Sequence, residues 1–389
     1  MITELSADSL ASLDPSILTE LETPCYLFDP SIVAEDLEAL RAELGTPVIV
    51  SLKASPVLDL LVRCNHVLGD GVEIASMGEL NMTIGRISVP RFVNTPAMDG
   101  KLVAAALAAR ATLIVDSPHQ ITLIESALRT PQAAGRPAPH IILRVNAGSL
   151  LGRADASQDQ FGMDLPTLYR VLDRLSSGGT KLKVVGLHAF AGSLSFAASA
   201  APLAQALAAL VPELRKFSAA PLETVIIGAG LAADWRESLP DFAGYREALA
   251  PLKRQVEVRH EAGRAIFSRS GRFAVRVVAT KALGERGIVV CDGGMAQCFP
   301  LAQTEQFVKR WRSPKLVSLS GEQPADYAEP RTYTVVGNSC NRADVVGQLD
   351  TRRAPQPGDM LVFEHCGAYH SYSPTGFLNL RPAQRYIAS

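Results

Sequence analysis

The chain has 389 residues but only six cysteines, and none of these lies in a Cys-x-x-Cys pair. That spacing argues against a zinc ribbon and against the disulfide framework of a small secreted domain. No apolar run reaches the roughly 18 residues that span a bilayer. The acidic N-terminus lacks the basic and then apolar order of a secretory signal. We therefore expect a cytoplasmic protein with reduced thiols, without a bound metal and without a membrane partner.

An excess of charge of either sign is also lacking. The 38 lysines and arginines nearly balance the 39 aspartates and glutamates, which leaves a formal net charge of -1. Nucleic acids and anionic membranes attract strongly basic surfaces. The composition therefore gives no reason to expect either of them as a partner.

Between about residues 45 and 270, short β-branched runs alternate with segments rich in alanine and leucine. In segments such as 99–110 and 202–217, apolar residues recur with the spacing of a helix that packs one face on a sheet. This alternation predicts an α/β fold. A doubly wound sheet would favour G-x-G-x-x-G in its first βα turn, and that motif is missing. We therefore predict a (β/α)8 TIM-like barrel, with strands near 46–52, 71–76, 91–94, 111–117, 140–146, 183–190, 223–230 and 256–263.

After about residue 270 the pattern changes to strand-like segments with little helix between them, such as FAVRVVATKAL (273–283) and DMLVFEHCGAY (359–369). These segments predict a second, all-β domain at the C-terminal end. The strand-like CYLFD (25–29) precedes the first barrel helix, and we expect it to pair with that domain. The expected domains are a barrel at residues 30–270 and a β domain at residues 1–29 and 271–389.

A lysine, Lys53, follows the first predicted barrel strand in VIVSLKASP (48–56). Barrel strands are filled mainly with Val, Ile and Leu, and their C-terminal ends carry catalysis. We expect partial desolvation to lower the pKa of this lysine and to make it nucleophilic toward an aldehyde. An ordinary surface lysine at a strand end is the alternative.

Two other strand ends carry groups that bind phosphate or a ring nitrogen. The GAG turn (228–230) exposes backbone amides that can approach a phosphate without obstruction, although a plain tight turn explains it as well. At the end of the eighth strand, Glu261 can hold a protonated ring nitrogen and Arg264 can clamp a phosphate, with a salt bridge between the two as the alternative. Pyridoxal 5'-phosphate contains the aldehyde, the phosphate and the ring nitrogen that these groups would bind.

These motifs occur in an order that resembles the fold-type III pyridoxal-phosphate decarboxylases, a family that includes ornithine/arginine-type and diaminopimelate decarboxylases. The resemblance spans residues 24–385. The motifs are SLKASP (51–56), DGVEIASMGEL (70–80), VDS (115–117), ILRVN (142–146), QFGMD (160–164), GLHAFAGS (186–193), GAG (228–230), EAGR (261–264), DGGM (292–295), GNSCNRADV (337–345) and PGDMLVFEHCGAY (357–369).

By this resemblance, Lys53 holds the cofactor aldehyde as a Schiff base and Glu261 binds the ring nitrogen. A protonated ring is the electron sink for the charge that remains when CO2 leaves an amino-acid substrate. Glu79 is a further acidic position on the cofactor side. The other cofactor positions of the family fall on Glu73, Arg144, His188, Phe190, Ser193, Gly228, Ala229, Gly230, Arg264 and Tyr369.

A second catalytic residue implied by the resemblance is Cys340, which matches the family's cysteine after a Gly-x-x run. This cysteine is expected to return a proton to the substrate carbon from the neighbouring subunit. An inert, buried cysteine is the alternative. A site shared in this way implies an obligate homodimer, two-fold and head to tail.

The sequence departs from the family at three places that bear on the substrate. Phe190 replaces the second histidine of an H-x-H motif, so the ring stacked on the cofactor carries no charge, and His188 is then a candidate core residue. Asn341 stands where diamine-forming members commonly carry an acid for the distal ammonium. No arginine follows DGGM in DGGMAQCFPLAQ (292–303), where diaminopimelate decarboxylases typically have one for the distal carboxylate.

Within the family, the likeness is greatest to the siderophore-biosynthesis branch, the citryl-amino-acid decarboxylases of staphyloferrin B, achromobactin and vibrioferrin assembly. The shared features are the longer loop at 147–164 and a Phe377-Leu378 tail. We expect Arg153 in this loop to meet a citrate carboxylate through a two-point contact, with a solvated loop arginine as the alternative. The expected substrate-binding residues are Arg153, Asn341 and Phe377.

Three other functions stay open. A decarboxylase of diaminopimelate or another free amino acid has the same motifs. An amino-acid racemase shares the barrel and the lysine, but typically has Tyr-Gly-His after its lysine, where this chain has Ala54-Ser55-Pro56. A pseudoenzyme that binds protein partners is expected to lose its cofactor residues, and this chain keeps them.

Overall fold

The computed structural model describes residues 3–5, 13–130, 139–154, 159–178, 180, 182–302, 312–319, 326–372 and 376–389. The chain forms two compact units. The barrel unit consists of Glu35–Lys53 and Cys64–Ala265, and the sheet unit of Met1–Ala34, Ala54–Arg63 and Ile266–Ser389. The chain therefore enters the barrel unit twice, and it leaves for the first time directly after Lys53.

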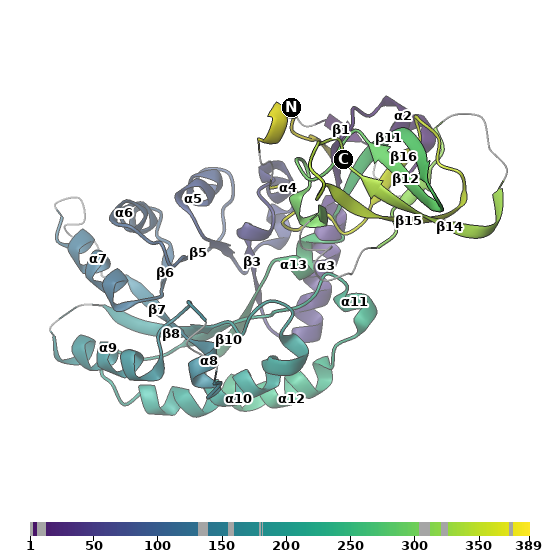
Figure 1. Ribbon diagram of the computed structural model, residues 1–389. Coiled ribbons are helices and arrows are strands. Elements are labelled where there is room, and N and C mark those ends of the chain that lie inside the picture. Colours follow the sequence, from purple (N-terminus) through teal and green to yellow (C-terminus); the bar gives the residue numbers. More distant parts are fainter. Residues whose placement is uncertain are drawn as a thin grey trace. The chain divides into compact units, whose positions relative to one another are not determined.

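Within the described residues, eight parallel strands close a barrel in the order β10-β3-β4-β5-β6-β7-β8-β9 (Figure 1). This confirms the predicted (β/α)8 barrel, and each strand lies inside the range expected from the sequence. The strands are β3 (Val48–Ser51), β4 (Val72–Ile74), β5 (Arg91–Asn94), β6 (Thr112–Val115), β7 (His140–Val145), β8 (Lys183–Ala189), β9 (Thr224–Gly228) and β10 (Glu257–Ala262).

The barrel has an apolar core to which six strands each contribute one residue. Alternate side chains of a strand point to opposite faces, so one of every two residues can face inward. Burying a large apolar side chain contributes roughly 1.5–3 kcal/mol. A barrel filled in this way leaves the ends of the strands for binding. The cluster consists of Ile49, Phe92, Ile114, Ile142, Val185 and Ile226.

Helices cover the outside of the barrel strands (Figure 1). Several begin at a residue whose side chain accepts a backbone N–H of the first turn, as Ser76 does from Glu79 and Asp99 does from Leu102. The longer helices that flank the barrel strands in sequence are α3 (Pro30–Leu44), α5 (Met77–Thr83), α6 (Gly100–Ala108), α7 (Pro118–Leu128), α9 (Leu165–Ser177), α10 (Phe196–Leu214) and α12 (Phe242–Lys253). Short turns are η1 (Leu52–Ala54), η2 (Asn65–Val67), α8 (Ala147–Leu150), α11 (Trp235–Ser238) and α13 (Arg264–Phe267).

The helix α10 corrects the expectation that no apolar run reaches the length of a membrane span. It has 19 residues and is apolar enough to cross a bilayer by length and composition alone. In the structure it packs against α12, and it buries a stripe that includes Leu203, Leu207 and Val211. A one-sided stripe of this kind is typical of a helix that covers a sheet, so α10 is one of the outer helices of the barrel.

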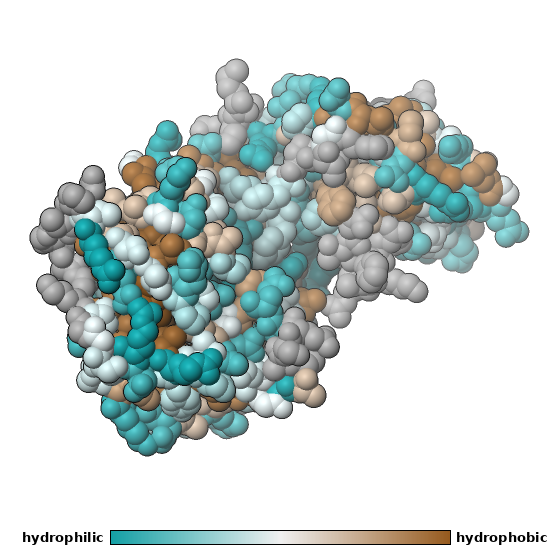
Figure 2. All heavy atoms as spheres, turned by 60° about the vertical axis from the view of Figure 1, so that its left-hand side comes forward, coloured by the Kyte–Doolittle hydropathy of each residue, from teal (hydrophilic) through white to brown (hydrophobic). Residues whose placement is uncertain are grey.

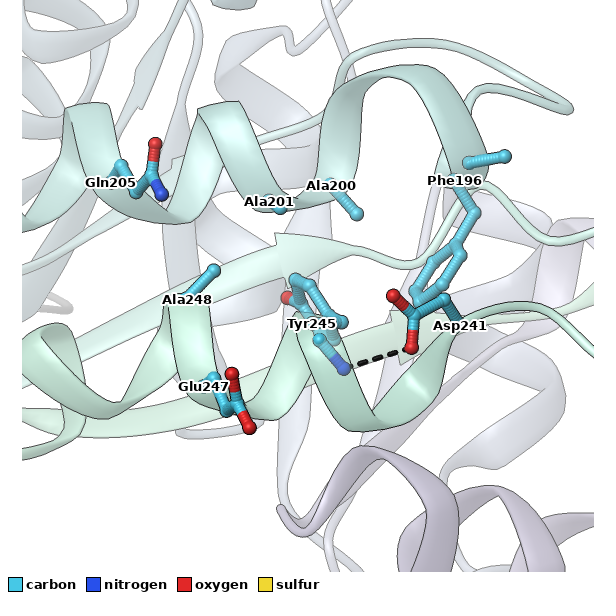
Figure 3. A pocket seen from close by; sticks show the side chains of 10 residues that line it. Phe196, Ala200, Ala201, Gln205, Asp241, Tyr245, Glu247 and Ala248 are labelled. Carbon is cyan, nitrogen blue, oxygen red and sulfur yellow. Dashed lines mark hydrogen bonds between the residues drawn. The ribbon is translucent and has the colours of Figure 1, made fainter.

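A hollow lies between α10 and α12 (Figure 3). At one end of it the rings of Phe196 and Tyr245 pack edge to face with their centres 5.0 Å apart. Asp241 accepts the N–H of Gly244 at 2.9 Å, which caps the first turn of α12. The residues that line this hollow include none of the predicted site residues, so we assign it to the packing of two outer helices.

The sheet unit contains a mixed sheet of nine strands within the described residues. Its path runs β1-β17-β2-β11-β12-β14-β15, while β16 pairs with β11 and β13. The predicted pairing of the N-terminal strand is confirmed, because β2 pairs with β11 and β17. The elements are β1 (Thr3–Leu5), α2 (Pro15–Glu20), β2 (Cys25–Phe28), α4 (Leu58–Arg63), β11 (Gly271–Leu283), β12 (Arg286–Cys291), β13 (Lys315–Val317), β14 (Asp326–Val336), β15 (Val345–Arg353), β16 (Met360–Phe363), η6 (Phe377–Asn379) and β17 (Gln384–Ala388).

Strand β15 is a part of this sheet that the sequence patterns did not predict. Its residues VVGQLDTRR are largely polar, yet it pairs along much of β14. Because β15 ends the path of the sheet, its polar residues are those of a protected edge strand.

The surface mixes apolar and polar residues. Figure 2 shows a face on which hydrophobic atoms are interrupted by hydrophilic ones. Such mixing is ordinary, since apolar atoms contribute more than half of a folded protein's accessible surface.

Candidate active site

Three neighbouring strands of the barrel bring one amine and two carboxylates together. Lys53 lies in η1 directly after β3, Glu73 lies in β4, and Glu261 lies in β10. The barrel order places β3 between β4 and β10. The carboxyl ends of parallel strands meet at one end of a barrel, so residues that are far apart in sequence become neighbours there.

The amine of Lys53 is held between the two carboxylates. Its Nζ lies 3.0 Å from Glu261 Oε1 and 3.1 Å from Glu73 Oε2. Ser51 donates a short hydrogen bond to Glu73 Oε2. His188 on β8 donates from Nε2 to Glu261 Oε2 at 2.9 Å. The lysine side chain is 41% exposed, whereas Glu73 and Glu261 are 2% and 9% exposed, so the amine links a buried acidic pair to the open side of the site.

The electrostatics of this cluster correct the expected pKa of Lys53. Burial alone lowers the pKa of the amine, but the charges of Glu261 and Glu73 and their hydrogen bonds outweigh burial and raise the pKa well above its usual value. Lys53 is therefore protonated at neutral pH in this arrangement. It needs a base to become nucleophilic.

The two carboxylates have opposite shifts. Burial raises the pKa of Glu73, and the charge of Glu261 raises it further. Burial also opposes ionisation of Glu261, but the charge of Lys53 and the hydrogen bond from His188 hold the pKa of Glu261 well below its usual value. Glu261 is therefore the permanent anion, and Glu73 is the carboxylate that can take up a proton.

His188 is neutral and buried, as expected for a core residue, yet it also contacts the candidate site. Burial lowers its pKa. Its Nε2 donates to Glu261, and its Nδ1 has no hydrogen-bond partner among the described residues. The ring therefore orients Glu261 and leaves Nδ1 as a buried acceptor.

Arg144, on β7, belongs to a second buried polar network. Its Nη1 donates to Asp116 Oδ1 at 3.2 Å and to Asn94 Oδ1 at 3.4 Å. The guanidinium carbon lies 4.4 Å from the centre of the Phe161 ring. Asp116 also accepts the N–H of Gly162. The network ties the QFGMD segment to the strand ends, which fits a supporting position.

Sequence reasoning missed Ser51, Asn94 and Asp116 as members of these networks. All three are buried polar residues at or just after the C-terminal end of a barrel strand. A polar residue at such a position is the signal that identifies them in sequence.

The GAG turn lies against Glu261 and Phe190. Gly228 pairs with Glu261 across β9 and β10, and Ala229 N–H donates to the Glu261 carbonyl at 2.8 Å. A Cβ on Gly228 would lie 2.3 Å from the Phe190 ring. Gly230 has a φ of +62°, which favours glycine. The turn, Phe190 and Glu261 thus form one packed group.

Three further residues of the barrel unit occupy its surface or its margin. Ser193 is exposed after β8, and Arg264 is half-buried at the start of α13. Arg153 is exposed and donates from Nη2 to Ser199 Oγ at 2.5 Å. Residues 155–158 of the same loop lie outside the described residues.

The other predicted site residues belong to the sheet unit. Tyr369 has a φ of +66° and donates its N–H to the carbonyl of Ala54, the residue after Lys53. Cys340 is exposed. Asn341, also exposed, accepts the N–H of Ala343 through Oδ1 at 2.9 Å. Phe377 begins η6, and its side chain lies outside the described residues.

A comparison with known protein families identifies the family to which the chain belongs. The family described as "Pyridoxal-dependent decarboxylase, C-terminal sheet domain" matches residues 25–367. That range contains the barrel strands and most strands of the sheet unit.

Curated relatives and solved structures match nearly the whole chain. The "Probable diaminopimelate decarboxylase, chloroplastic" of Oryza sativa subsp. japonica is 27% identical over 94% of this chain and 75% of its own length. The "L-glutamyl-[BtrI acyl-carrier protein] decarboxylase" of Niallia circulans is 23% identical over 94% of this chain and 90% of its own. The crystal structure of diaminopimelate decarboxylase from Helicobacter pylori, complexed with L-lysine, superposes with a TM-score of 0.79 at 20% identity, covering 96% of this chain and 93% of that one.

Proposed function

Because the chain belongs to the pyridoxal-dependent decarboxylase family, we propose that it removes CO2 from a carboxylate-rich conjugate of citrate and an amino acid, of the kind used in siderophore biosynthesis. Decarboxylation with pyridoxal 5'-phosphate follows from the family. The observation that supports the reaction here is the amine of Lys53 between Glu73 and Glu261 at the strand ends.

The residues of the barrel unit fit the cofactor by their chemistry. Lys53 offers the amine that an aldehyde requires, and Glu261 is an ionised, nearly buried carboxylate suited to a ring N–H. The Nδ1 of His188, which has no partner among the described residues, is a buried acceptor beside them. Gly230, with its positive φ, turns the backbone at the end of β9, where amides can meet a phosphate.

When bound, the cofactor supplies an electron sink for the pair of electrons that remains as CO2 leaves the substrate. Lys53 would hold the aldehyde, and Glu261 would hold the ring nitrogen through an oxygen oriented by His188. In its ionised form Glu73 would accept the proton that Lys53 Nζ must lose, because its raised pKa makes it the more basic of the two carboxylates. By the family resemblance, the residues that would hold the phosphate are Gly228, Ala229, Gly230, Ser193, Arg264 and Tyr369, and Phe190 would stack on the cofactor ring.

The proton that replaces CO2 comes from Cys340 of the neighbouring subunit in this proposal, with Lys53 as the second candidate donor. The exposure of Cys340 supports the idea, because a donor that acts on another chain must be accessible. The active form is then a homodimer whose two sites are shared.

The proposed substrate rests on which charged side chains the chain offers to the distal groups of a substrate. Phe190 is apolar where the family stacks a histidine, and Asn341 removes the acid that would hold a distal ammonium. The segment after DGGM lacks the arginine typical of diaminopimelate decarboxylases. A substrate with a second amine or a single distal carboxylate therefore loses its usual partner.

Arg153 is the proposed contact for a citrate carboxylate. It keeps one hydrogen bond to Ser199, but a guanidinium carries five N–H donors. It can retain Ser199 and present a second edge to a carboxylate. The Niallia circulans relative, named for a glutamyl group on a carrier protein, supports the idea that this fold accepts amino-acid conjugates.

The alternative is decarboxylation of diaminopimelate or another free amino acid, which the names of several relatives favour. One assay separates the two: CO2 release from citryl-serine, citryl-diaminopropionate, diaminopimelate, ornithine and lysine, measured side by side. We expect kcat/KM for a citryl conjugate to exceed that for every free amino acid by at least about tenfold. A preference for a free dibasic amino acid contradicts the proposed substrate, although it leaves the decarboxylase intact.

Two controls belong to the same assay. Arg153→Ala is expected to raise KM for the citryl conjugate about tenfold with little change in kcat. The control Arg170→Ala removes an exposed arginine bonded to Thr167 on α9 and should leave both constants unchanged.

The other two functions are tested separately. Chiral analysis of the product excludes a racemase if CO2 release accounts for all substrate consumed. A protein that binds no cofactor would instead support the pseudoenzyme.

A further inference from the structure

The sheet unit contains a second cluster of reactive side chains, formed by Cys298, Cys366 and His370. One ligand atom of each residue lies within 4.8 Å of the corresponding atoms of the other two. Cys298 follows β12, whereas Cys366 and His370 follow β16. All three are buried, at 0%, 0% and 6% exposure. Two thiols and an imidazole thus converge in a part of the core where apolar residues would normally pack.

The histidine of this cluster is oriented as a metal ligand usually is. His370 Nδ1 lies 2.6 Å from the carbonyl oxygen of Ala368. A carbonyl only accepts, so Nδ1 donates, and the neutral ring then carries its lone pair on Nε2. Metal-ligating histidines typically donate their other nitrogen to a backbone carbonyl in this way.

A tyrosine adjoins the sulfur of Cys298. The Tyr26 hydroxyl lies 2.9 Å from the Gln297 carbonyl and 2.7 Å from the His370 carbonyl, and it also contacts Cys298. The single hydroxyl proton is engaged by these two carbonyls, so the Tyr26 oxygen can only accept in a hydrogen bond with Cys298.

We propose that Cys298, Cys366 and His370 bind one zinc ion. Two thiolates and a neutral imidazole around Zn²⁺ form a group without net charge, which a buried site tolerates, whereas Cu⁺ would leave one negative charge. Zn–S bonds of about 2.3 Å place tetrahedral ligand atoms roughly 3.8 Å apart, so the three donors need to approach by at most about 1 Å. Binding releases the two thiol protons, one of which Cys366 now shares with the Glu364 carbonyl at 3.5 Å.

The ion would fix the segment that contains Tyr369. Cys366 and His370 flank Tyr369, whose backbone has a positive φ and donates to Ala54. Because residues on both sides of Tyr369 would bind the same ion, the ion would fix the backbone of Tyr369 without contacting its side chain. The zinc site itself is independent of the proposed function. Only the consequence that a fixed Tyr369 would help to hold the cofactor phosphate rests on that function.

The test measures zinc on the holoenzyme, kept reduced and freed of metal with a chelator. We expect the wild type to take up one Zn²⁺ per chain in competition with a chromophoric chelator, and to release protons as it does. Cys298→Ala and Cys366→Ala are expected to weaken binding at least about 100-fold, and His370→Gln about tenfold. Cys291→Ala, a buried cysteine of the same unit outside the cluster, is the matched control and binds like the wild type.

A second measurement does not depend on the variants folding. Cobalt added to the wild type should produce thiolate-to-metal charge-transfer absorption, which zinc then abolishes. The proposal is overturned if the wild type takes up no zinc, if cobalt gives no such absorption, or if both cysteine variants retain wild-type affinity. It is equally overturned if peptide mass spectrometry finds a Cys298–Cys366 disulfide that excludes the metal.

Discussion

Each unit of the chain buries a histidine beside reactive groups, and the two clusters balance charge differently. In the barrel unit, His188 donates to Glu261, whose charge is met by Lys53 at 3.0 Å. In the sheet unit, His370 donates to the Ala368 carbonyl beside two thiols. The barrel cluster carries its own counter-charge, whereas the thiols of the sheet cluster ionise only when a cation binds and displaces their protons. A site for an organic cofactor can therefore be preorganised by ion pairs among its own residues. A site for a metal can instead be preorganised from uncharged, buried side chains.

The largest expected effect comes from removing the cation of the barrel cluster. Lys53→Ala leaves Glu73 and Glu261 without their shared partner and, by the proposed function, would remove the amine that holds the cofactor. We expect kcat to fall by at least about a thousandfold and the visible absorbance of the bound cofactor to disappear. Lys253→Ala, an exposed lysine bonded to the Gly45 carbonyl, is the control. Normal turnover by purified Lys53→Ala would contradict the assignment of this lysine.

The next effect tests the permanent anion. Glu261→Gln keeps the shape of the side chain but removes the charge that faces Lys53 and accepts from His188. We expect kcat to fall by about 100- to 1,000-fold, with a smaller change in KM. Glu257→Gln, on the same strand and paired with Arg259 at its exposed start, should change kcat less than about twofold. Equal effects of the two variants would exclude a specific role for Glu261.

A pair of glycines compares the rigidity of the two units. A Cβ on Gly228 of the barrel meets the Phe190 ring at 2.3 Å, while a Cβ on Gly367 of the sheet unit meets the Phe267 carbonyl oxygen at 1.9 Å. A side chain can move aside more easily than backbone, so Gly228→Ala should cost about 1–2 kcal/mol of unfolding free energy and Gly367→Ala about 3 kcal/mol or more. Denaturant unfolding measures both, with Gly69→Ala as a control whose Cβ meets no described atom within 4 Å. The reverse order would show that the barrel rim is the more rigid region.

The last effect is a pH dependence of stability that concerns a third buried histidine, His260, which has both ring nitrogens bonded. Its Nδ1 lies 2.6 Å from Thr46 Oγ1 and its Nε2 lies 2.6 Å from the Tyr245 hydroxyl. Burial and then the charge of Lys253 lower the pKa of His260 to about 3.

The unfolded chain therefore takes up this proton near pH 6.5 and the folded chain only near pH 3. Between these values the unfolded state binds one more proton, so stability falls as the pH falls, by up to about 1.4 kcal/mol per pH unit. Urea unfolding from pH 7 to pH 4 measures the slope. In His260→Gln the number of protons taken up on unfolding should fall by about one, which makes the slope smaller. An unchanged slope would contradict a neutral, buried His260 in the folded state.

The fold was largely predictable because its signals are local. The β-branched runs and the helical spacing between them follow from contacts of each element with its neighbours, and all eight barrel strands lie in their predicted ranges. Strand β15 was missed because an edge strand has no need of an apolar pattern. The statement that no apolar run reaches the length of a membrane span was wrong, because Phe196–Leu214 meets that length and composition; only its packing identifies it as an outer helix.

The candidate site was predictable as a set of residues but not as an electrostatic arrangement. Lys53 and Glu261 were identified from their positions after predicted strands. The pKa of Lys53 was predicted in the wrong direction, because desolvation was considered without Glu73 and Glu261. The cluster of Cys298, Cys366 and His370 was invisible in the sequence, where its cysteines are 68 positions apart (366 minus 298) and form no recognisable motif.

The sequence by itself determined the order of strands and helices and which residue types stand at the strand ends, since both depend on neighbours along the chain. Only the tertiary structure decided which charges meet. Lys53 and Glu261 are separated by 208 positions in the chain, and closure of the barrel brings β10 beside β3. Coulombic interactions depend on distance in space, so the state of the amine follows from the closed barrel and not from the segment that contains it.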